Sequence, residues 1–318
     1  MLIPTNESFT IMELDTGNVC QLQCPTCNRQ DPEFKPHLNK AKYLTVDDFR
    51  IILRKFPNVE RFFLGLIFDE PTFNPNLVDI IHFLKKQGKS ITLNTNGGLN
   101  VKAYDWLYII NFMDNNDRIV WSLDGLSQET YQIHRKNGNF QQLLNTISFT
   151  IRNNQKYPGP THIIQIIKFE HNKEEIERDL EKFKLKYMLK WEKPVWDVID
   201  SNGRCTIPTD EVKPTWNIDG LNQLHENTLD DIIPDNPACL KESTIFMGHN
   251  GRLGLCLSNT LETLKLNKQF SVYDSIEDIN DYIKNFYQNF NENKTCKFLC
   301  SSKLQEQKLK LNLDITIT

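Results

Sequence analysis

The chain alternates short runs of β-branched and aromatic residues with longer segments in which apolar residues recur every three or four positions. The short runs predict strands, and the longer segments predict amphipathic helices. We expect strands at residues 9–14, 61–66, 90–94, 119–123, 163–169 and 195–199. We expect helices at residues 45–56, 76–86, 103–112, 140–153 and 173–185. Thr45 and Asp48 open the first helix in the manner of a capping box, with Asp in place of Glu.

Regular alternation of strands and helices favours a parallel α/β sheet with right-handed crossovers. Six such units predict a partial (β/α)6 barrel, and 318 residues are enough to bury a substantial core. In parallel sheets and barrels the chemistry gathers at the carboxyl ends of the strands. Functional residues are therefore expected just after the predicted strands.

The alternation stops near residue 200, where four prolines punctuate an irregular stretch. Residues 243–247 and 252–257 flank a glycine-bounded turn at 248–251 and predict a β-hairpin. A helix is expected at 275–290 and a strand at 308–318. We divide the chain into a barrel (1–205), a connector (206–236) and a small C-terminal α+β domain (237–318).

The charge balance adds a constraint on partners. A net charge of −4 and a pI near 6.0 give no basic field for a phosphate backbone, so nucleic acid is not favoured. The first ten residues lack the pattern of a secretory signal, and no segment has the 18 or so apolar residues of a membrane span. We expect a cytoplasmic protein without membrane contact.

The eight cysteines are unevenly placed, and three of them form a compact group. Cys20, Cys24 and Cys27 follow the first predicted strand, and Pro25 stiffens the loop between them. Three thiolates at this spacing can converge on one iron-sulfur cube and leave one iron open. The alternatives are a zinc site completed by a distant residue and loop cysteines that bind no metal.

This C-x3-C-x2-C segment resembles the signature of the radical S-adenosylmethionine (SAM) superfamily, and later strand ends resemble the family in order. Residues 68–71, Phe-Asp-Glu-Pro, stand where the family usually has Gly-Gly-Glu-Pro to hold the amino group of SAM. Asn-Thr-Asn-Gly at 94–97 and Ser-Leu-Asp-Gly at 122–125 resemble two further family segments. Arg135 resembles the arginine that meets the SAM carboxylate. The cofactor-binding residues implied are Glu70, Asn94, Asn96, Ser122, Asp124 and Arg135.

The chain departs from the family pattern at three positions. Thr26 replaces an aromatic residue that often precedes the third cysteine. Phe68 and Asp69 replace two glycines whose usual role is a close backbone approach. The family resemblance implies a [4Fe-4S] cluster that binds SAM, and reductive cleavage to a 5′-deoxyadenosyl radical that abstracts a substrate hydrogen.

The C-terminal cysteines resemble an auxiliary-cluster module of the SPASM or shorter twitch type. Cys239, Gly251 and Cys256 follow the pattern C-x11-G-x4-C, and Cys296 and Cys300 complete a set of four. Four cysteines are enough for one auxiliary [4Fe-4S] cluster, so twitch is the better match. A structural zinc knot and buried free thiols remain alternatives. Cys205, after the last predicted barrel strand, is a candidate hydrogen-atom donor or a buried free thiol.

The family resemblance implies an electron donor such as flavodoxin or ferredoxin, and the auxiliary cluster implies a net oxidation. Oxidative modification of a peptide is the first hypothesis for the reaction. The sequence leaves no room before the first predicted strand for the peptide-recognition domain of many peptide-modifying enzymes. A dehydrogenase of a small molecule such as an aminocyclitol or sugar is therefore the close alternative. The non-enzyme alternative is a structural zinc or iron-sulfur protein.

Overall fold

The computed structural model describes residues 4–30, 32, 34–98, 103–154, 159–188, 194–200, 244–255 and 270–288. Eight strands form one sheet in the order β6-β5-β4-β3-β2-β1-β7-β8. The first six are parallel to one another and follow chain order across the sheet. Their bounds are β1 Ile11–Leu14, β2 Arg61–Leu64, β3 Ser90–Thr95, β4 Arg118–Ser122, β5 Thr161–Lys168 and β6 Val195–Asp200.

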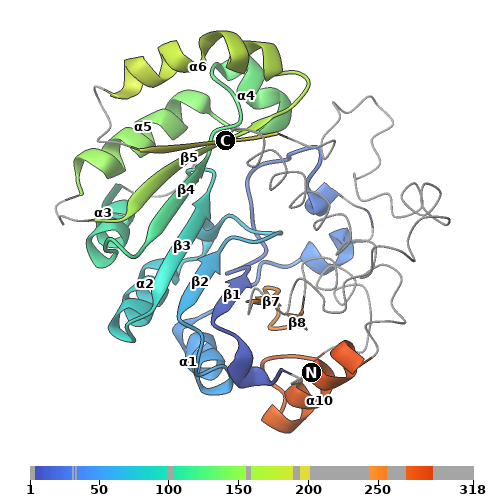
Figure 1. Ribbon diagram of the computed structural model, residues 1–318. Helices are drawn as coiled ribbons and strands as arrows, with labels where there is room; N and C mark the ends of the chain where they lie inside the picture. Colours follow the sequence, from blue (N-terminus) through green and yellow to red (C-terminus); the bar gives the residue numbers. More distant parts are fainter. Residues whose placement is uncertain are drawn as a thin grey trace, which may run out of the picture.

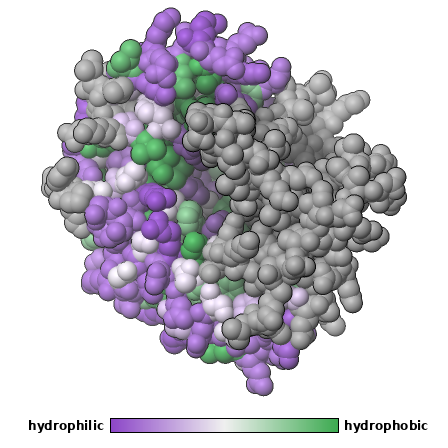
Figure 2. Space-filling model, viewed as in Figure 1, coloured by the Kyte–Doolittle hydropathy of each residue, from purple (hydrophilic) through white to green (hydrophobic). Residues whose placement is uncertain are grey.

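Helices cover the outer side of this curved sheet (Figure 1). They are α1 Val46–Lys55, α2 Leu77–Lys86, α3 Ala103–Phe112, α4 Gln128–His134, α5 Phe140–Arg152 and α6 Lys173–Met188. Short 3-10 helices occur at η1 Asn6–Ser8, η2 Asn28–Gln30, η3 Lys35–Leu38 and η4 Pro71–Phe73, and α10 spans Ile276–Gln288. The solvent-facing surface of the helical layer is mostly hydrophilic (Figure 2). No helix in the described ranges is both long and apolar enough to cross a membrane.

The core lies between the sheet and the helices. Every second residue of a strand faces the helices, so Leu64 and Leu93 are fully buried there with Ile52 and Ile81 of the adjoining helices. Trp121 of β4 packs on Trp106 of α3 with ring centroids 5.0 Å apart. The opposite, inner faces of the strands are left free to carry polar residues.

The expected α/β partial barrel is confirmed. All six strands are present, with ends that differ by at most two residues from the sequence prediction. The capping box of α1 is also present: Thr45 Oγ1 accepts from the N–H of Asp48, while Asp48 Oδ2 accepts from the N–H of Thr45 at 2.7 Å. Helix α4 was not predicted, because its seven residues are too few to show helical periodicity.

The hairpin consists of β7 (Thr244–Met247) and the antiparallel β8 (Leu253–Gly254). Strand β7 pairs in parallel with β1, so that Ile11 lies opposite Thr244 and Leu14 opposite Met247. Figure 1 shows the hairpin beside β1, on the far side from β2. The hairpin therefore extends the barrel sheet. The connector and the expected strand at 308–318 lie outside the described residues, and the domain boundaries stay a prediction.

Candidate functional site

A cavity of about 320 Å³ opens where β1 to β4 end, and β5 contributes Gln165 to its wall. Loops that follow the first four strands supply most of its walls, as expected for a parallel barrel. Its lining residues are Cys20, Leu22, Cys24, Thr26, Cys27, Arg29, Gly65, Leu66, Ile67, Asp69, Glu70, Asn94, Thr95, Asn96, Ser122, His134, Arg135 and Gln165.

The three N-terminal cysteines share this cavity, and none of them forms a disulfide. A turn places them together, because the N–H of Cys27 donates to the carbonyl of Cys24 at 3.1 Å. Arg29 anchors the end of the loop by donating to the carbonyl oxygens of Asn18, at 2.6 Å, and of Phe68. The loop is thus held to the segments that follow β1 and β2.

Burial makes these thiols weak acids. It raises the pKa of Cys20 to about 12 and of Cys27 to about 11, and it also raises the pKa of Cys24. Iron or zinc binding requires thiolates, so a metal would have to displace these protons. In the described ranges no three His, Cys, Asp or Glu side chains converge tightly enough for a single ion.

Two hydrogen-bond donors face the sulfur atoms. Asn96 Nδ2 lies 3.5 Å from Cys20 Sγ, and Arg135 Nη1 lies 3.8 Å from Cys24 Sγ. Donors aimed at ligand sulfurs stabilise negative charge on them and tune the potential of an iron-sulfur cluster. Soft thiolates beside a polar cavity therefore fit an iron-sulfur cluster with a second ligand next to it.

Glu70 follows β2 and is almost completely buried, at 2% exposure. Its Oε1 accepts from the hydroxyls of Thr95 and Thr72 at 2.6 and 2.7 Å, and its Oε2 accepts from the N–H of Asn96 at 2.7 Å. Burial raises its pKa in spite of these donors. The carboxylate therefore joins the ends of β2 and β3 while one side of the residue lines the cavity.

The predicted residues of β3 and β4 also reach the cavity. Asn94 donates from Nδ2 to the carbonyl of Gly65 at 3.1 Å, and Asn96 Oδ1 accepts from Gln21 of the cysteine loop at 2.6 Å. Ser122 ends β4 and lies opposite Gln165 of β5 in the sheet register. The structure thus places Asn94, Asn96 and Ser122 on the wall of one cavity.

Asp124 and Arg135 contact each other, and only Arg135 lines the cavity. Asp124 Oδ2 accepts from Arg135 Nε at 2.7 Å and also pairs with Nη2, while Oδ1 accepts from the N–H of Ile167 at 2.8 Å. Asp124 is fully buried behind the guanidinium. Its place is behind the cavity wall, where it orients Arg135.

The polar lining residues that were not predicted as site residues include Arg29, His134 and Gln165. Gln165 interrupts an apolar strand on its inner face, and that break in the pattern is a usable signal. His134 packs on Phe169 with centroids 4.2 Å apart, and burial lowers its pKa to about 3, helped by the charge of Arg135. It is neutral at pH 7. Cys205, Cys239, Cys256, Cys296 and Cys300 lie outside the described residues.

Comparison with known proteins gives the same assignment for the barrel. The family model of the radical SAM superfamily matches residues 14–183. No curated protein sequence matches the chain. Solved structures with a similar fold include two of SuiB from Streptococcus suis and one of anSMEcpe.

SuiB bound to S-adenosylmethionine is 15% identical, with 88% of this chain and 68% of SuiB covered, at a TM-score of 0.58. SuiB bound to the precursor peptide SuiA is 15% identical, with 87% and 66% covered, at a TM-score of 0.57. The structure of anSMEcpe with bound AdoMet and the Kp18Cys peptide is 14% identical, with 91% and 83% covered, at a TM-score of 0.55. At these identities the likeness shows a shared fold.

The family match spans more than half of the 318 residues. It includes Cys20, Cys24 and Cys27 and the ends of β1 to β4. The chain belongs to the radical SAM superfamily.

Proposed function

We propose that this radical SAM enzyme uses Cys20, Cys24 and Cys27 to hold a [4Fe-4S] cluster, binds SAM in the adjoining cavity and oxidatively modifies a peptide. The observation that carries the proposal is the shared cavity: the three thiols and the polar ends of β2, β3 and β4 line one space of about 320 Å³. When bound, the cluster and SAM supply an adenosyl radical able to remove a hydrogen atom from a substrate.

The residues around the cavity have separable tasks in this proposal. Arg135 already uses Nε and Nη2 on Asp124, and its Nη1 is directed toward Cys24, so it can meet the carboxylate of SAM beside the cluster. Glu70 accepts from Thr72 and Thr95 at Oε1 and from Asn96 at Oε2, and Oε2 can accept a second hydrogen bond, from the amino group of SAM. It supports the SAM site by fixing the ends of β2 and β3, and Asn94, Asn96 and Ser122 present polar groups to the ligand.

A peptide substrate is supported by the solved structures that share the fold. SuiB was solved with its precursor peptide, and anSMEcpe was solved with a peptide. We further propose that Cys239, Cys256, Cys296 and Cys300 bind one auxiliary [4Fe-4S] cluster, that flavodoxin or ferredoxin supplies electrons, and that Cys205 takes part in hydrogen-atom transfer.

Anaerobic reconstitution followed by iron counting and a 5′-deoxyadenosine assay tests the cofactor part. Two cubane clusters require about eight irons per chain. Replacing Cys20, Cys24 and Cys27 by Ala should remove about four irons and all 5′-deoxyadenosine. The matched control replaces the four C-terminal cysteines, and it should also lose about four irons but retain cleavage. Zinc in place of iron, or cleavage by the first variant, contradicts the proposal.

The substrate part is tested by incubating the reconstituted enzyme with SAM and short peptides encoded beside its gene. A peptide mass lower by two hydrogens, formed together with 5′-deoxyadenosine, is the expected result. Hydrogen donation by Cys205 to the substrate radical would instead return one hydrogen and leave the composition of the peptide unchanged. In D2O the wild type should then place one deuterium in the modified peptide, and Cys205→Ala should not, while it retains 5′-deoxyadenosine. Two-hydrogen loss from an amino sugar or cyclitol, with every peptide unchanged, would replace the peptide by a small-molecule substrate.

A further inference from the structure

Two aspartates meet beneath the cysteine loop, one from each of two neighbouring loops. Asp15 directly follows β1 and is fully buried. Its Oδ1 accepts from the backbone N–H groups of Ile67 and Phe68 at 2.7 and 2.9 Å. Asp15 therefore holds the loop that follows β2, at Ile67 and Phe68, two to three residues before Glu70.

Asp69 does the same in the opposite direction. Its Oδ2 accepts from the N–H and the hydroxyl of Thr16 at 2.7 and 2.6 Å, and from the N–H of Gly17 at 3.0 Å. Thr16 and Gly17 begin the loop that leads to Cys20. Each carboxyl group thus fixes the backbone on the other side, and the two loops are held together twice.

The second oxygen of each aspartate has no donor. Asp15 Oδ2 and Asp69 Oδ1 are both excluded from solvent and accept no hydrogen bond, although other parts of Asp69 are partly exposed. Asp69 accepts from the residue next to Asp15, and Asp15 accepts from the residue next to Asp69, so the two carboxyl groups are neighbours, and each affects the pKa of the other. Two ionised carboxylates in this contact would repel strongly in a buried site.

The surrounding charges do not resolve this repulsion. Among the described residues, neither aspartate forms an ion pair. The Arg29 guanidinium donates to the carbonyls of Asn18 and Phe68, and Glu70 adds a further negative charge. His249 packs on the Phe68 ring at 6.3 Å between centroids. A proton between the two oxygens would supply the missing donor.

We propose that Asp15 and Asp69 share one proton, between Oδ2 of Asp15 and Oδ1 of Asp69, and that this acid-carboxylate pair positions the cysteine loop against the loop of Glu70. Burial raises the pKa of both groups, and the charge of Asp15 raises that of Asp69 further. The inference stands on the buried contact and is independent of the reaction proposed above. It also gives Asp69 a task at a position where the family usually has glycine.

The pair predicts a specific pH dependence of folding. The unfolded chain releases both protons near the ordinary aspartate pKa, whereas the folded chain keeps one. From about pH 5 up to the pKa of the shared proton, the folded state therefore binds one proton more, and stability falls as pH rises. One proton corresponds to a tenfold decrease in the folding equilibrium constant per pH unit.

Asp69→Asn is the isosteric test. Its amide oxygen can accept from Thr16 and Gly17, and its NH2 can donate to Asp15 Oδ2 without a shared proton. Urea unfolding of the full-length reconstituted protein between pH 5 and 8 gives both profiles. The quantity compared is the ratio of the wild-type folding equilibrium constant to that of Asp69→Asn at each pH. All other titrating groups are common to both chains, so their contributions cancel in this ratio. The wild-type constant should fall relative to Asp69→Asn as pH rises, with a slope approaching tenfold per unit. Parallel profiles overturn the proposal.

Further variants separate the pair from a general effect of charge removal. Asp79→Asn, at an exposed position of α2, should follow the wild-type profile. Asp15→Asn should behave like Asp69→Asn, because its amide can also donate across the contact. The double Asn variant places two NH2 groups face to face, and its folding constant should fall more than tenfold below the value expected from the single variants.

Three other outcomes reject the pair. If Asp69→Asn abolishes SAM binding while the unfolding profiles stay parallel, Asp69 Oδ1 accepts from the ammonium group of SAM. If both single Asn variants fail to fold, the carboxamide does not reproduce the bonding of a shared proton. Magnesium or sodium added to the wild type at fixed ionic strength should have no effect on unfolding, and stabilisation by either cation identifies a cation site instead.

Discussion

Arg135 covers the carboxylate of Asp124, so that a fully buried charge is neutralised by a side chain that reaches the cavity. Asp124 has a positive φ of 46°, which Asn also tolerates. Removal of the guanidinium leaves the carboxylate buried without its partner. We expect Arg135→Ala to lower the free energy of unfolding by about 3 to 5 kcal/mol, measured by urea unfolding.

Asp124→Asn is the matched comparison. It keeps the backbone turn and an acceptor for the N–H of Ile167, and it leaves no uncompensated negative charge. Its loss of stability should be clearly smaller than that of Arg135→Ala. Equal losses in the two variants would mean that the ion pair is not what makes Arg135 important for folding.

The hydrogen bonds by which Glu70 joins the ends of β2 and β3 give a second prediction. In Glu70→Gln one oxygen becomes an NH2 group, which cannot accept from Thr95 or Asn96. A lost charged hydrogen bond and an unsatisfied buried donor together should cost about 1.5 to 3 kcal/mol in thermal or urea unfolding. Glu60→Gln, at an exposed position before β2, is the control and should change stability by less than about 0.5 kcal/mol.

Two glycines with positive φ permit a test of close approach at the cavity. Gly65 has a φ of +92°, and a Cβ there would lie 2.7 Å from the carbonyl oxygen of Asn94. Gly88 has a φ of +70°, and a Cβ there would meet nothing within 4 Å. Gly88→Ala should cost only the left-handed strain, about 1 to 2 kcal/mol.

Gly65→Ala also places a side chain at positive φ, and in addition its methyl group would push Asn94 of β3 away from the end of β2. We expect it to destabilise the protein by clearly more than Gly88→Ala and to weaken SAM binding to the reconstituted enzyme. Isothermal calorimetry and urea unfolding measure the two effects. Equal unfolding free energies in the two variants would show that the backbone accommodates a methyl group beside Asn94.

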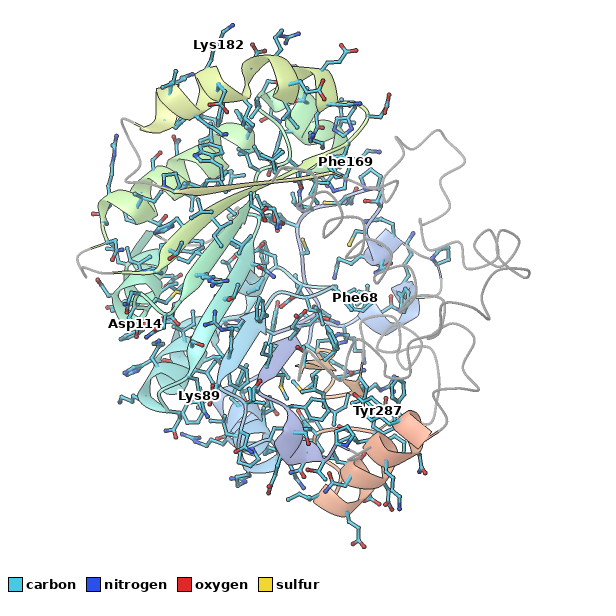
Figure 3. The ribbon with its side chains drawn as sticks, in the orientation of Figure 1. Phe68, Lys89, Asp114, Phe169, Lys182 and Tyr287 are labelled. Atoms are coloured by element: carbon cyan, nitrogen blue, oxygen red, sulfur yellow. The ribbon has the colours of Figure 1, made fainter. Side chains whose placement is uncertain are left out.

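Phe68 joins the cysteine loop to the C-terminal hairpin. It is 1% exposed, and its ring lies 5.2 Å from that of Phe34 and 6.3 Å from that of His249. Figure 3 shows Phe68 on the inner side of the sheet, next to the short helices that follow the cysteines. Phe68→Ala should destabilise the protein by about 3 to 5 kcal/mol, whereas Phe68→Leu should lose less than half of that. A neutral Phe68→Ala would mean that this contact does not hold the loop.

Local patterns in the sequence were sufficient for the barrel. Buried parallel strands are nearly continuous apolar runs, and short turns follow them, so β1 to β6 were found within two residues. Asn94 and Ser122 were predicted because they stand in segments that resemble the family, at the carboxyl ends of predicted strands. Helix α4 was missed because a seven-residue helix shows less than two full periods.

Contacts between distant segments could not be read in the same way. The bonds between Asp15 and the loop of Phe68 depend on the register of β1 and β2, in which Leu14 lies opposite Leu64. The pairing of β7 with β1 joins residues more than 200 positions apart, and nothing local specifies it. Phe68 and Asp69 were recognised as departures from the family, but their partners were visible only in three dimensions.

His162 of β5 is a buried neutral histidine on the helix side of the sheet. Its Nδ1 accepts from Trp121 Nε1 at 3.1 Å, while Nε2 is buried without a hydrogen-bond partner. Burial lowers its pKa from 6.5 to about 4. At pH values between these two pKa values, His162 is protonated in the unfolded chain and neutral in the folded chain. The free energy of unfolding therefore falls as pH decreases. The loss attributable to His162 should approach about 3 kcal/mol near pH 4.

His162→Gln tests this assignment, because an amide oxygen can still accept from Trp121 and the titrating group is removed. Urea unfolding at pH values from 7.5 to 4.5 should show a wild-type protein that loses stability relative to His162→Gln only below about pH 6.5. His134 also has a lowered pKa, but it is present in both chains and its contribution cancels. If the difference between the two proteins were constant over this range, His162 would accept its proton in the folded state as readily as in the unfolded chain, and the buried contact with Trp121 would not be what keeps it neutral.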